Sequence, residues 1–266
     1  MDGGIIMKTG FIGCGNMAKA MIKGMIASGK FASEDIMASA KSEQTWAKIH
    51  DELGICAAKT NREVAEFADV LVLAVKPHFY EEVIKEIADT VCEEQMIVSI
   101  APGKTLAWME ETFGKKVKLV RTMPNTPALV KEGMTALCCS DLITADEQKM
   151  ICDLCGTFGK VEVVPEKLMD VIPAVSGSSP AYVFMFIEAL ADAAVADGMP
   201  RAQAYTFAAQ AVLGSAKMVL ETGLHPGALK DMVCSPGGTT IEAVQVLEED
   251  GMRSAVMRAA RACTKK

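Results

Sequence analysis

The sequence has no surplus of basic residues and no cluster of them. Its 266 residues include 27 Lys and Arg against 34 Asp and Glu, so the net charge is -7. Proteins that bind nucleic acid or an anionic membrane surface usually present a basic patch, because phosphate charges must be neutralised. The composition therefore predicts neither a nucleic-acid partner nor a membrane partner.

The sequence also lacks a disulfide framework and a metal-binding pattern. Its nine cysteines are odd in number and dispersed, which is typical of reduced thiols in a cytosolic protein. Cys152 and Cys155 form a C-x-x-C pair, but the pair lies in a helical pattern with no second pair and no nearby His. We interpret the pair as small apolar packing residues rather than a zinc or redox site, and we expect no metal.

No signal peptide and no membrane span are expected. The start, MDGGIIMKTG, lacks a charged segment followed by a long apolar stretch, and Met7 is an alternative start. The densest apolar run, AYVFMFIEALADAAVA, contains Glu188 and Asp192 and is shorter than the roughly 20 residues that a spanning helix needs. These features predict a soluble, cytoplasmic protein.

The first part of the chain alternates short apolar β-rich runs with helical patterns. Seven such runs occur in order, and segments with a helical pattern, such as HFYEEVIKEIADTV, lie between several of them. The runs are KTGFIG, IMAS, ICAA, VLVLAV, MIVSIA, VKLVRTM and GMTALCCS. Near-continuous apolar strands that alternate with helices are typical of a parallel sheet covered on both faces. We therefore expect an α/β domain with a doubly wound parallel sheet over residues 1–165.

Residues 166–266 contain no further β-rich run. Long segments rich in Ala, Leu and Met predict helices, and Gly198 with Pro200 and Gly223 with Pro226 supply the breaks between them. The first two predicted helices are too apolar on all sides to expose a face to water. We expect an all-α domain that forms a homodimer, with burial inside the monomer as the alternative.

The segment GFIGCGNMA has the G-x-G-x-x-A spacing of a dinucleotide site, directly after an apolar strand and before an amphipathic helix. Gly13 allows the tight turn, Gly15 lets the pyrophosphate approach the backbone, and Ala18 allows close packing of helix on strand. The helix start, with Asn16 and Met17, offers free N–H groups to phosphates. The segment predicts a nicotinamide dinucleotide, with a plain tight turn as the alternative.

The end of the second strand predicts which dinucleotide is used. An NAD-specific site usually places an acidic residue there, on the ribose 2′-hydroxyl. This chain has Ser39, Ala40, Lys41 and Ser42 at that end. Hydroxyls and a Lys suit a 2′-phosphate, so we expect NADPH in preference to NADH, with a solvated surface as the alternative for Lys41.

Other strand ends are expected to face the same crevice and to contact the ribose and nicotinamide. They are Ala74, Val75, Lys76, Pro77, Ala101, Met123 and Asn125. Asn61 is expected on the adenosine side, with helix capping as the alternative.

Three later motifs narrow the substrate: AVKP at 74–77, VSGSSPAY at 175–182 and LKDMVCSPGGTTIEAV at 229–244. In the last, a Ser-Pro-Gly-Gly-Thr-Thr run opens a helix and exposes consecutive backbone N–H groups and two hydroxyls. Such a nest binds a carboxylate or another anion without a fixed cation. An ordinary N-cap would explain Thr239 or Thr240 but not the whole run.

Together with GFIGCGNMA, RTMPNTPALVKEGMTAL and HPGALKD, these motifs resemble the pyrroline-5-carboxylate reductase family, in order, from Lys8 to the chain end. The resemblance implies an N-terminal Rossmann domain, a C-terminal helical domain that interlocks with its twin, and an active site at that dimer interface. The sequence leaves open whether such dimers assemble into a higher homo-oligomer, for example a decamer. The implied reaction transfers hydride from NADPH or NADH to the C5 imine carbon of pyrroline-5-carboxylate and makes L-proline, the last step of proline biosynthesis.

The resemblance also implies residue roles. Thr239 matches the position whose hydroxyl contacts the imine nitrogen, and Lys76 and Pro77 match the cofactor-side strand end. The remaining substrate-binding positions are Ser176, Ser235, Gly237, Gly238 and Thr240.

One position departs from the family pattern, which usually has Gly where this chain has Ser179. We expect Ser179 to cap a helix start, because Pro180 follows in the place that a first helical turn tolerates. The alternative is a positive φ at this position, which would cost a serine about 1 kcal/mol or more.

No dedicated acid is expected, because a protonated imine is already electrophilic. His50, His78 and His225 lie outside the substrate loops. His78 follows AVKP, but a surface His at a helix start is the simpler interpretation. We expect Thr239 to donate or relay a hydrogen bond to the imine nitrogen while water completes the proton transfer.

Two other protein classes remain open. A β-hydroxyacid dehydrogenase has a similar glycine motif and a helical second domain, and it uses a Lys for which Lys217 and Lys230 are the candidates. A dinucleotide-sensing regulator would bind NADPH without turnover. Binding of L-proline would distinguish an enzyme from a sensor.

Overall fold

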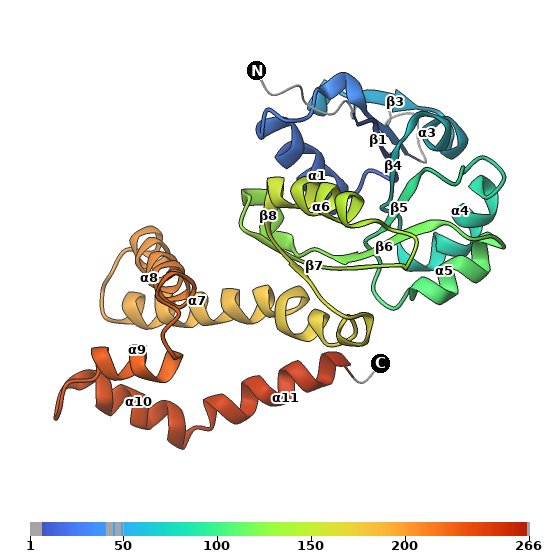
Figure 1. Cartoon of the computed structure of the whole chain (residues 1–266). Helices are drawn as coiled ribbons and strands as arrows, with labels where there is room; N and C mark the ends of the chain where they lie inside the picture. The colour runs from blue at the N-terminus through green and yellow to red at the C-terminus, as the bar shows by residue number, and fades with distance from the viewer. Residues whose placement is uncertain (1–6, 41–44, 46–48, 50, 265–266) are drawn as a thin grey trace. The chain divides into compact units, whose positions relative to one another are not determined.

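The structure is a computed structural model that describes residues 7–40, 45, 49 and 51–264. The chain forms two compact units, Met1–Gly177 and Ser178–Lys266 (Figure 1). The change in composition predicts a domain boundary after residue 165, earlier in the chain than the division between these two units. Each unit is described by itself below.

The N-terminal unit is built on one eight-stranded sheet with the order β3-β2-β1-β4-β5-β6-β7-β8 (Figure 1). The strands are β1 (Thr9–Ile12), β2 (Ile36–Ser39), β3 (Cys56–Ala58), β4 (Val70–Leu73), β5 (Met96–Ser99), β6 (Lys118–Met123), β7 (Gly133–Cys139) and β8 (Gly159–Val163). The first six strands run parallel. The strand order reverses between β1 and β4, so the predicted doubly wound Rossmann domain is confirmed.

Helices cover both faces of this sheet. They are α1 (Asn16–Ala27), α3 (Asn61–Phe67), α4 (Tyr80–Ile87), α5 (Leu106–Phe113) and α6 (Ala145–Cys155). Successive side chains of a strand point to opposite faces, so Phe11 joins the apolar cluster that contains residues of α1 and α6. Its neighbour Ile12 joins the cluster that contains residues of α3, α4 and α5.

The parallel pattern ends at β6, because β7 pairs with it antiparallel. Only a short connection with the 3-10 helix η3 (Thr126–Val130) joins the two strands, whereas a parallel pair needs a crossover of about a dozen residues or more. The sequence did not predict β8, a strand at the sheet edge with mostly exposed or half-buried side chains.

Residues 166–177 belong to the N-terminal unit although their composition resembles the helical part of the chain. Arg121 of β6 is buried, and its guanidinium pairs with Glu166 at 3.3 Å and with Asp170 at 2.8 Å. Met169 is also buried, against apolar residues of β7. These contacts hold the segment against the sheet.

Tyr80, the first residue of α4, joins the carboxyl ends of β4 and β5. Its buried hydroxyl donates to the carbonyl oxygen of Leu73 and accepts from the backbone N–H of Ile100 at 3.2 Å. Burial raises the pKa of the Tyr80 phenol to about 12, so the phenol remains a neutral donor near neutral pH.

We expect Tyr80→Phe to lower the free energy of unfolding by about 1–3 kcal/mol, because the Leu73 carbonyl and the Ile100 N–H lose a buried partner. Tyr205→Phe is the matched control, since Tyr205 is 41% exposed. Denaturant unfolding measures both. Equal stability of the two variants would contradict a structural role for the Tyr80 hydroxyl.

The C-terminal unit is helical, as predicted. Its helices are α7 (Ser179–Ala196), α8 (Arg201–Thr222), α9 (Pro226–Val233), α10 (Thr239–Glu249) and α11 (Met252–Thr264). Ala191, Ala204 and Ala208 are buried, while Phe184 and Phe207 are 62% and 67% exposed. The described part of this unit thus buries small side chains and leaves large apolar ones uncovered.

One helical segment of the described chain, Pro173–Ala196, is long and apolar enough to cross a membrane by length and composition. The sequence argument that this run is too short is therefore wrong, because the helical segment extends over 24 residues. Length and composition alone are weak evidence for a membrane span, since an apolar helix of a soluble protein can have the same length and composition.

Candidate active site

The turn between β1 and α1 is pressed against the end of β4. The backbone N–H of Ala74 donates to the carbonyl oxygen of Ile12 at 2.9 Å. Gly13 has a φ of +93°, and a Cβ there would lie 2.9 Å from the Ala74 carbonyl oxygen. A side chain would meet both backbone strain and a steric conflict, so the turn needs glycine.

The start of α1 is open in front of this turn. Gly15 is the N-cap of α1, it makes no side-chain cap hydrogen bond, and a Cβ added to it would meet nothing within 4 Å. Asn16 and Met17 form the first turn, and Ala18 is buried behind them. Free N–H groups at a helix start bind phosphate, so these residues fit the pyrophosphate of a dinucleotide.

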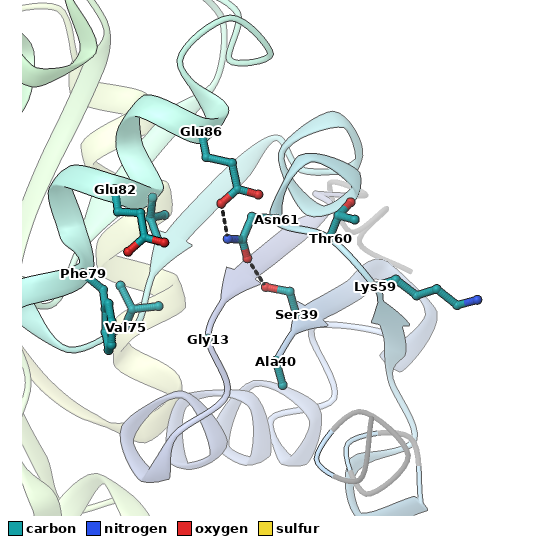
Figure 2. A pocket seen from close by; sticks show the side chains of 11 residues that line it. Gly13, Ser39, Ala40, Lys59, Thr60, Asn61, Val75, Phe79, Glu82 and Glu86 are labelled. Carbon is teal, nitrogen blue, oxygen red and sulfur yellow. Dashed lines mark hydrogen bonds between the residues drawn. The ribbon is translucent and has the colours of Figure 1, made fainter. Parts of the chain in front are cut away.

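A cleft of about 240 Å³ opens at the point where the strand order reverses (Figure 2). Its lining consists of Gly13, Ser39, Ala40, Lys59, Thr60, Asn61, Val75, Phe79, Glu82, Val83 and Glu86. The structure thus brings together four predicted cofactor residues, Gly13, Ser39, Asn61 and Val75, from the ends of β1, β2 and β4 and the start of α3. Ligands bind at this switch point in open α/β sheets.

A chain of hydrogen bonds crosses the cleft (Figure 2). The Ser39 hydroxyl donates to Asn61 Oδ1 at 2.7 Å, and Asn61 Nδ2 donates to Glu86 Oε2 at 2.7 Å. Thr60, not Asn61, is the N-cap of α3 and accepts from the backbone N–H of Glu63. The alternative that Asn61 only caps the helix is therefore wrong.

Sequence reasoning missed several lining residues. Lys59 and Thr60 follow the predicted third strand, so the rule that located the other strand ends could have found them. Glu82 and Glu86 lie one turn apart on α4, and no local signal shows that this helix face borders the cleft. Lys41, Ser42 and His50 lie outside the described residues.

The other predicted cofactor residues lie at the same sheet edge but do not line this cleft. Lys76 and Pro77 are exposed after β4, Ala101 is buried after β5, and Met123 ends β6. His78 is exposed and lies against Phe79, with ring centroids 4.1 Å apart.

Asn125 fastens the segment that contains Ser176. Its side chain donates to the Ser176 carbonyl oxygen at 2.9 Å and accepts from the backbone N–H of Met134 at 2.8 Å. Ser176 is half-buried in a π-helical turn, Pro173–Gly177, and its hydroxyl contacts the Ile172 carbonyl oxygen at 3.4 Å. Turns of this kind are frequent at functional sites.

The segment predicted to form an anion nest makes a tight turn in the C-terminal unit. The backbone N–H of Gly238 donates to the Ser235 carbonyl oxygen at 3.1 Å, and Gly237 has a φ of +67°. With Pro236 before Gly237, this is the arrangement of a type II turn. Gly238 is then the N-cap of α10 and makes no side-chain cap hydrogen bond.

The first two residues of α10, which follow this turn directly, both carry hydroxyls. Thr239 is exposed and Thr240 is half-buried. An open helix start, with its positive dipole end, and two nearby hydroxyls are groups of the kind that bind a carboxylate.

Ser179 is the first residue of α7, with Ser178 as the N-cap and Pro180 in the first turn. Among the described non-glycine residues, Lys131 alone has a positive φ. The expected helix start is confirmed, but Ser178 and not Ser179 is the N-cap. The serine at 179 causes no positive-φ strain.

The lysines considered as an acid or base of a dehydrogenase, and the Cys155 thiol considered for redox or metal chemistry, show no sign of those functions. Lys217 pairs with Glu221 at 3.5 Å and Lys230 pairs with Asp231 at 2.5 Å, both on the surface. Burial raises the pKa of the Cys155 thiol to about 12, so this thiol is not a reactive thiolate at neutral pH. In the described part of the chain, no group of three or more His, Cys, Asp and Glu could hold a metal ion.

The glycine turn, the open start of α1 and the cleft at the switch point define the class of protein: it is a nicotinamide-dinucleotide-dependent oxidoreductase. Residues 8–103 match the family model "NADP oxidoreductase coenzyme F420-dependent", and residues 166–266 match "Pyrroline-5-carboxylate reductase dimerisation". The pyrroline-5-carboxylate reductase of Escherichia coli is 54% identical over 97% of this chain and 96% of its own length. The chain belongs to the pyrroline-5-carboxylate reductase family.

Solved structures give the same result. The pyrroline-5-carboxylate reductase of Coxiella burnetii superposes with a TM-score of 0.90 at 36% identity, over 98% of this chain and 97% of that one. The Plasmodium falciparum pyrroline carboxylate reductase with NADP bound has a TM-score of 0.89 at 31% identity, over 97% and 96% of the two chains. The membership removes the β-hydroxyacid dehydrogenase alternative.

We expect Gly13→Ala and Gly15→Ala to separate folding from cofactor binding. Gly13→Ala should lower the free energy of unfolding by about 1 kcal/mol or more, because of the positive φ and the contact with Ala74. Gly15→Ala should leave stability unchanged and weaken NADPH binding about tenfold or more, because its methyl group enters open space at the helix start. Thermal unfolding and NADPH titration measure both, and unchanged affinity in Gly15→Ala would exclude a pyrophosphate at this turn.

Proposed function

We propose that this chain reduces 1-pyrroline-5-carboxylate to L-proline, the last step of proline biosynthesis, with NADPH used in preference to NADH. The observation that carries the proposal is the presence, in one chain of this family, of a dinucleotide cleft and of the Ser-Pro-Gly-Gly-Thr-Thr anion nest. A sensor of dinucleotides would have no use for a carboxylate site of this kind.

The nest is suited to the substrate carboxylate. The turn of Ser235, Gly237 and Gly238, the open start of α10 and the hydroxyl of Thr240 hold the carboxylate, while the exposed hydroxyl of Thr239 donates to or relays a proton toward the imine nitrogen. When bound, the nicotinamide supplies the hydride that the imine carbon receives. The protein orients the reactants, and solvent completes the proton transfer to nitrogen.

The other predicted positions remain part of the proposal. Gly13, Gly15, Asn16 and Met17 hold the pyrophosphate. Residues on the nicotinamide side are Ala74, Val75, Lys76, Pro77, Ala101, Met123 and Asn125, and Ser176 contributes to the substrate site. The Asn125 side chain acts there through the segment of Ser176, because its hydrogen bonds hold that segment in place.

The preference for NADPH is supported by the residues around the end of β2. No acidic residue follows Ser39 directly, and the exposed side chain of Lys59 lines the cleft. An ammonium group suits the 2′-phosphate that distinguishes NADPH. Lys41 remains a further candidate for that phosphate.

The reaction is tested first by the initial rate of NADPH and NADH oxidation on addition of pyrroline-5-carboxylate. We expect rapid, substrate-dependent oxidation, with a higher kcat/KM for NADPH. L-Proline should bind as the product. Tight NADPH binding without oxidation, and without proline binding, would favour the sensor.

For Thr239, we expect Thr239→Ala to lower kcat about tenfold or more, because the hydrogen bond to the imine nitrogen is lost. Thr239→Ser should recover most of the rate, since it keeps the hydroxyl. Thr206→Ala is the control, because Thr206 is exposed and its hydroxyl bonds within α8, to the Ala202 carbonyl oxygen. Wild-type turnover in Thr239→Ala would remove the hydroxyl from the mechanism.

A homodimer, able to assemble into a higher homo-oligomer, is also part of the proposal, as is a cytoplasmic location with reduced thiols. The exposed aromatic side chains of Phe184 and Phe207 lie in the region that matches the dimerisation model. Covering such side chains is worth about 25 cal/mol per Å², which favours association through α7 and α8.

We expect the wild-type chain to sediment at twice its monomer mass or at a multiple of that. Phe184→Ser with Phe207→Ser should weaken association about 30-fold or more, as loss of two buried aromatic anchors does. Leu142→Ser, at a 40% exposed leucine of the N-terminal unit, is the control. Sedimentation velocity over a concentration series measures the association of each variant. Equal association of both variants would place the interface elsewhere.

A further inference from the structure

The hydrogen-bond chain in the cofactor cleft has a fixed direction. A carboxylate only accepts hydrogen bonds, so Glu86 requires the NH₂ group of Asn61 to face it, at 2.7 Å. This orientation turns Asn61 Oδ1 toward Ser39, whose hydroxyl donates its single proton there at 2.7 Å. The Ser39 oxygen then has only lone pairs to offer to the cleft (Figure 2).

The two dinucleotides require opposite partners at this point. The 2′-hydroxyl of NADH can donate a hydrogen bond to the Ser39 oxygen, whereas the 2′-phosphate of NADPH only accepts and needs donors or cations. Lys59 supplies a cation at the rim, but Glu82 and Glu86 add two acidic side chains to the same lining. The cleft therefore contains one group that attracts the 2′-phosphate and two acidic groups that repel it.

We infer that Glu86 determines cofactor specificity as a positioning residue: it orients Asn61 and, through it, Ser39, so that the cleft accepts the 2′-hydroxyl of NADH and the preference for NADPH is limited. This inference rests on the proposed dinucleotide-dependent reaction. NAD-specific sites usually place an acidic residue at the end of the second strand. Here the acidic residue lies on α4 and acts through the Asn61 amide.

The test is equilibrium binding of NADPH and of NADH, without substrate, by titration calorimetry. In Glu86→Gln, Asn61 can present its NH₂ group to Ser39, and the Ser39 hydroxyl can donate into the cleft. We expect the ratio of the NADH Kd to the NADPH Kd to rise about tenfold, as the gain of one donor to a charged group allows.

Glu82→Gln is the matched control. Glu82 lies on the same helix and lines the same cleft, but it is not part of this hydrogen-bond chain. The loss of an exposed charge alone should change the ratio about twofold. Equal shifts in the two variants would reduce the effect to overall charge and overturn the inference.

The Asn61→Ala background separates the relay from a direct effect of Glu86. Once Asn61 is removed, adding Glu86→Gln should change the ratio no more than Glu82→Gln does. A tenfold shift that persists without Asn61 would overturn the relay. Because binding is measured without substrate, failure of the wild type to reduce pyrroline-5-carboxylate would refute the proposed reaction and leave this result intact.

Discussion

The close approach of the β1–α1 turn to the end of β4 is the contact on which the N-terminal unit depends. The Ala74 N–H holds the Ile12 carbonyl, and the Ala74 oxygen leaves no room for a Cβ at Gly13. The chain must therefore turn at once into α1, whose uncapped start faces open space at Gly15. Because β1 and β4 are neighbours at the reversal of strand order, this turn, Ser39 and Asn61 border one cleft.

Polar contacts extend this arrangement away from the cofactor cleft. Arg121 is almost fully buried and has two acidic partners, and removal of partners would leave an uncompensated buried charge, which is costly. Asn125 and the hydroxyl of Tyr80 add hydrogen bonds at the ends of β6 and of β4 and β5. The strand ends and the segment up to Gly177 are thus held by a few specific polar groups, while apolar packing on both faces stabilises the sheet itself.

The helical unit, unlike the N-terminal unit, has little apolar packing of its own. It buries alanines and exposes large apolar side chains such as Phe184 and Phe207, so it has little core of its own, and its stability is expected to depend on association. The proposed anion site needs no such core, because the turn at Gly237 and the start of α10 are formed by local backbone hydrogen bonds. The same unit therefore combines a locally determined turn, which is the proposed substrate site, with large apolar side chains that need a cover.

The sequence by itself determined the features that local physics decides. Hydrophobic periodicity located seven of the eight strands, the glycine spacing located the turn at Gly13, and the Ser-Pro-Gly-Gly-Thr-Thr run located the nest. It missed β8, since an edge strand has no continuous apolar pattern. Only the tertiary structure decided that β7 runs antiparallel, that Arg121 holds residues 166–170, and that Glu86 borders the cleft beside Asn61. These contacts join residues that are far apart in the chain. Tertiary packing determines which residues meet, and a local sequence pattern cannot predict it.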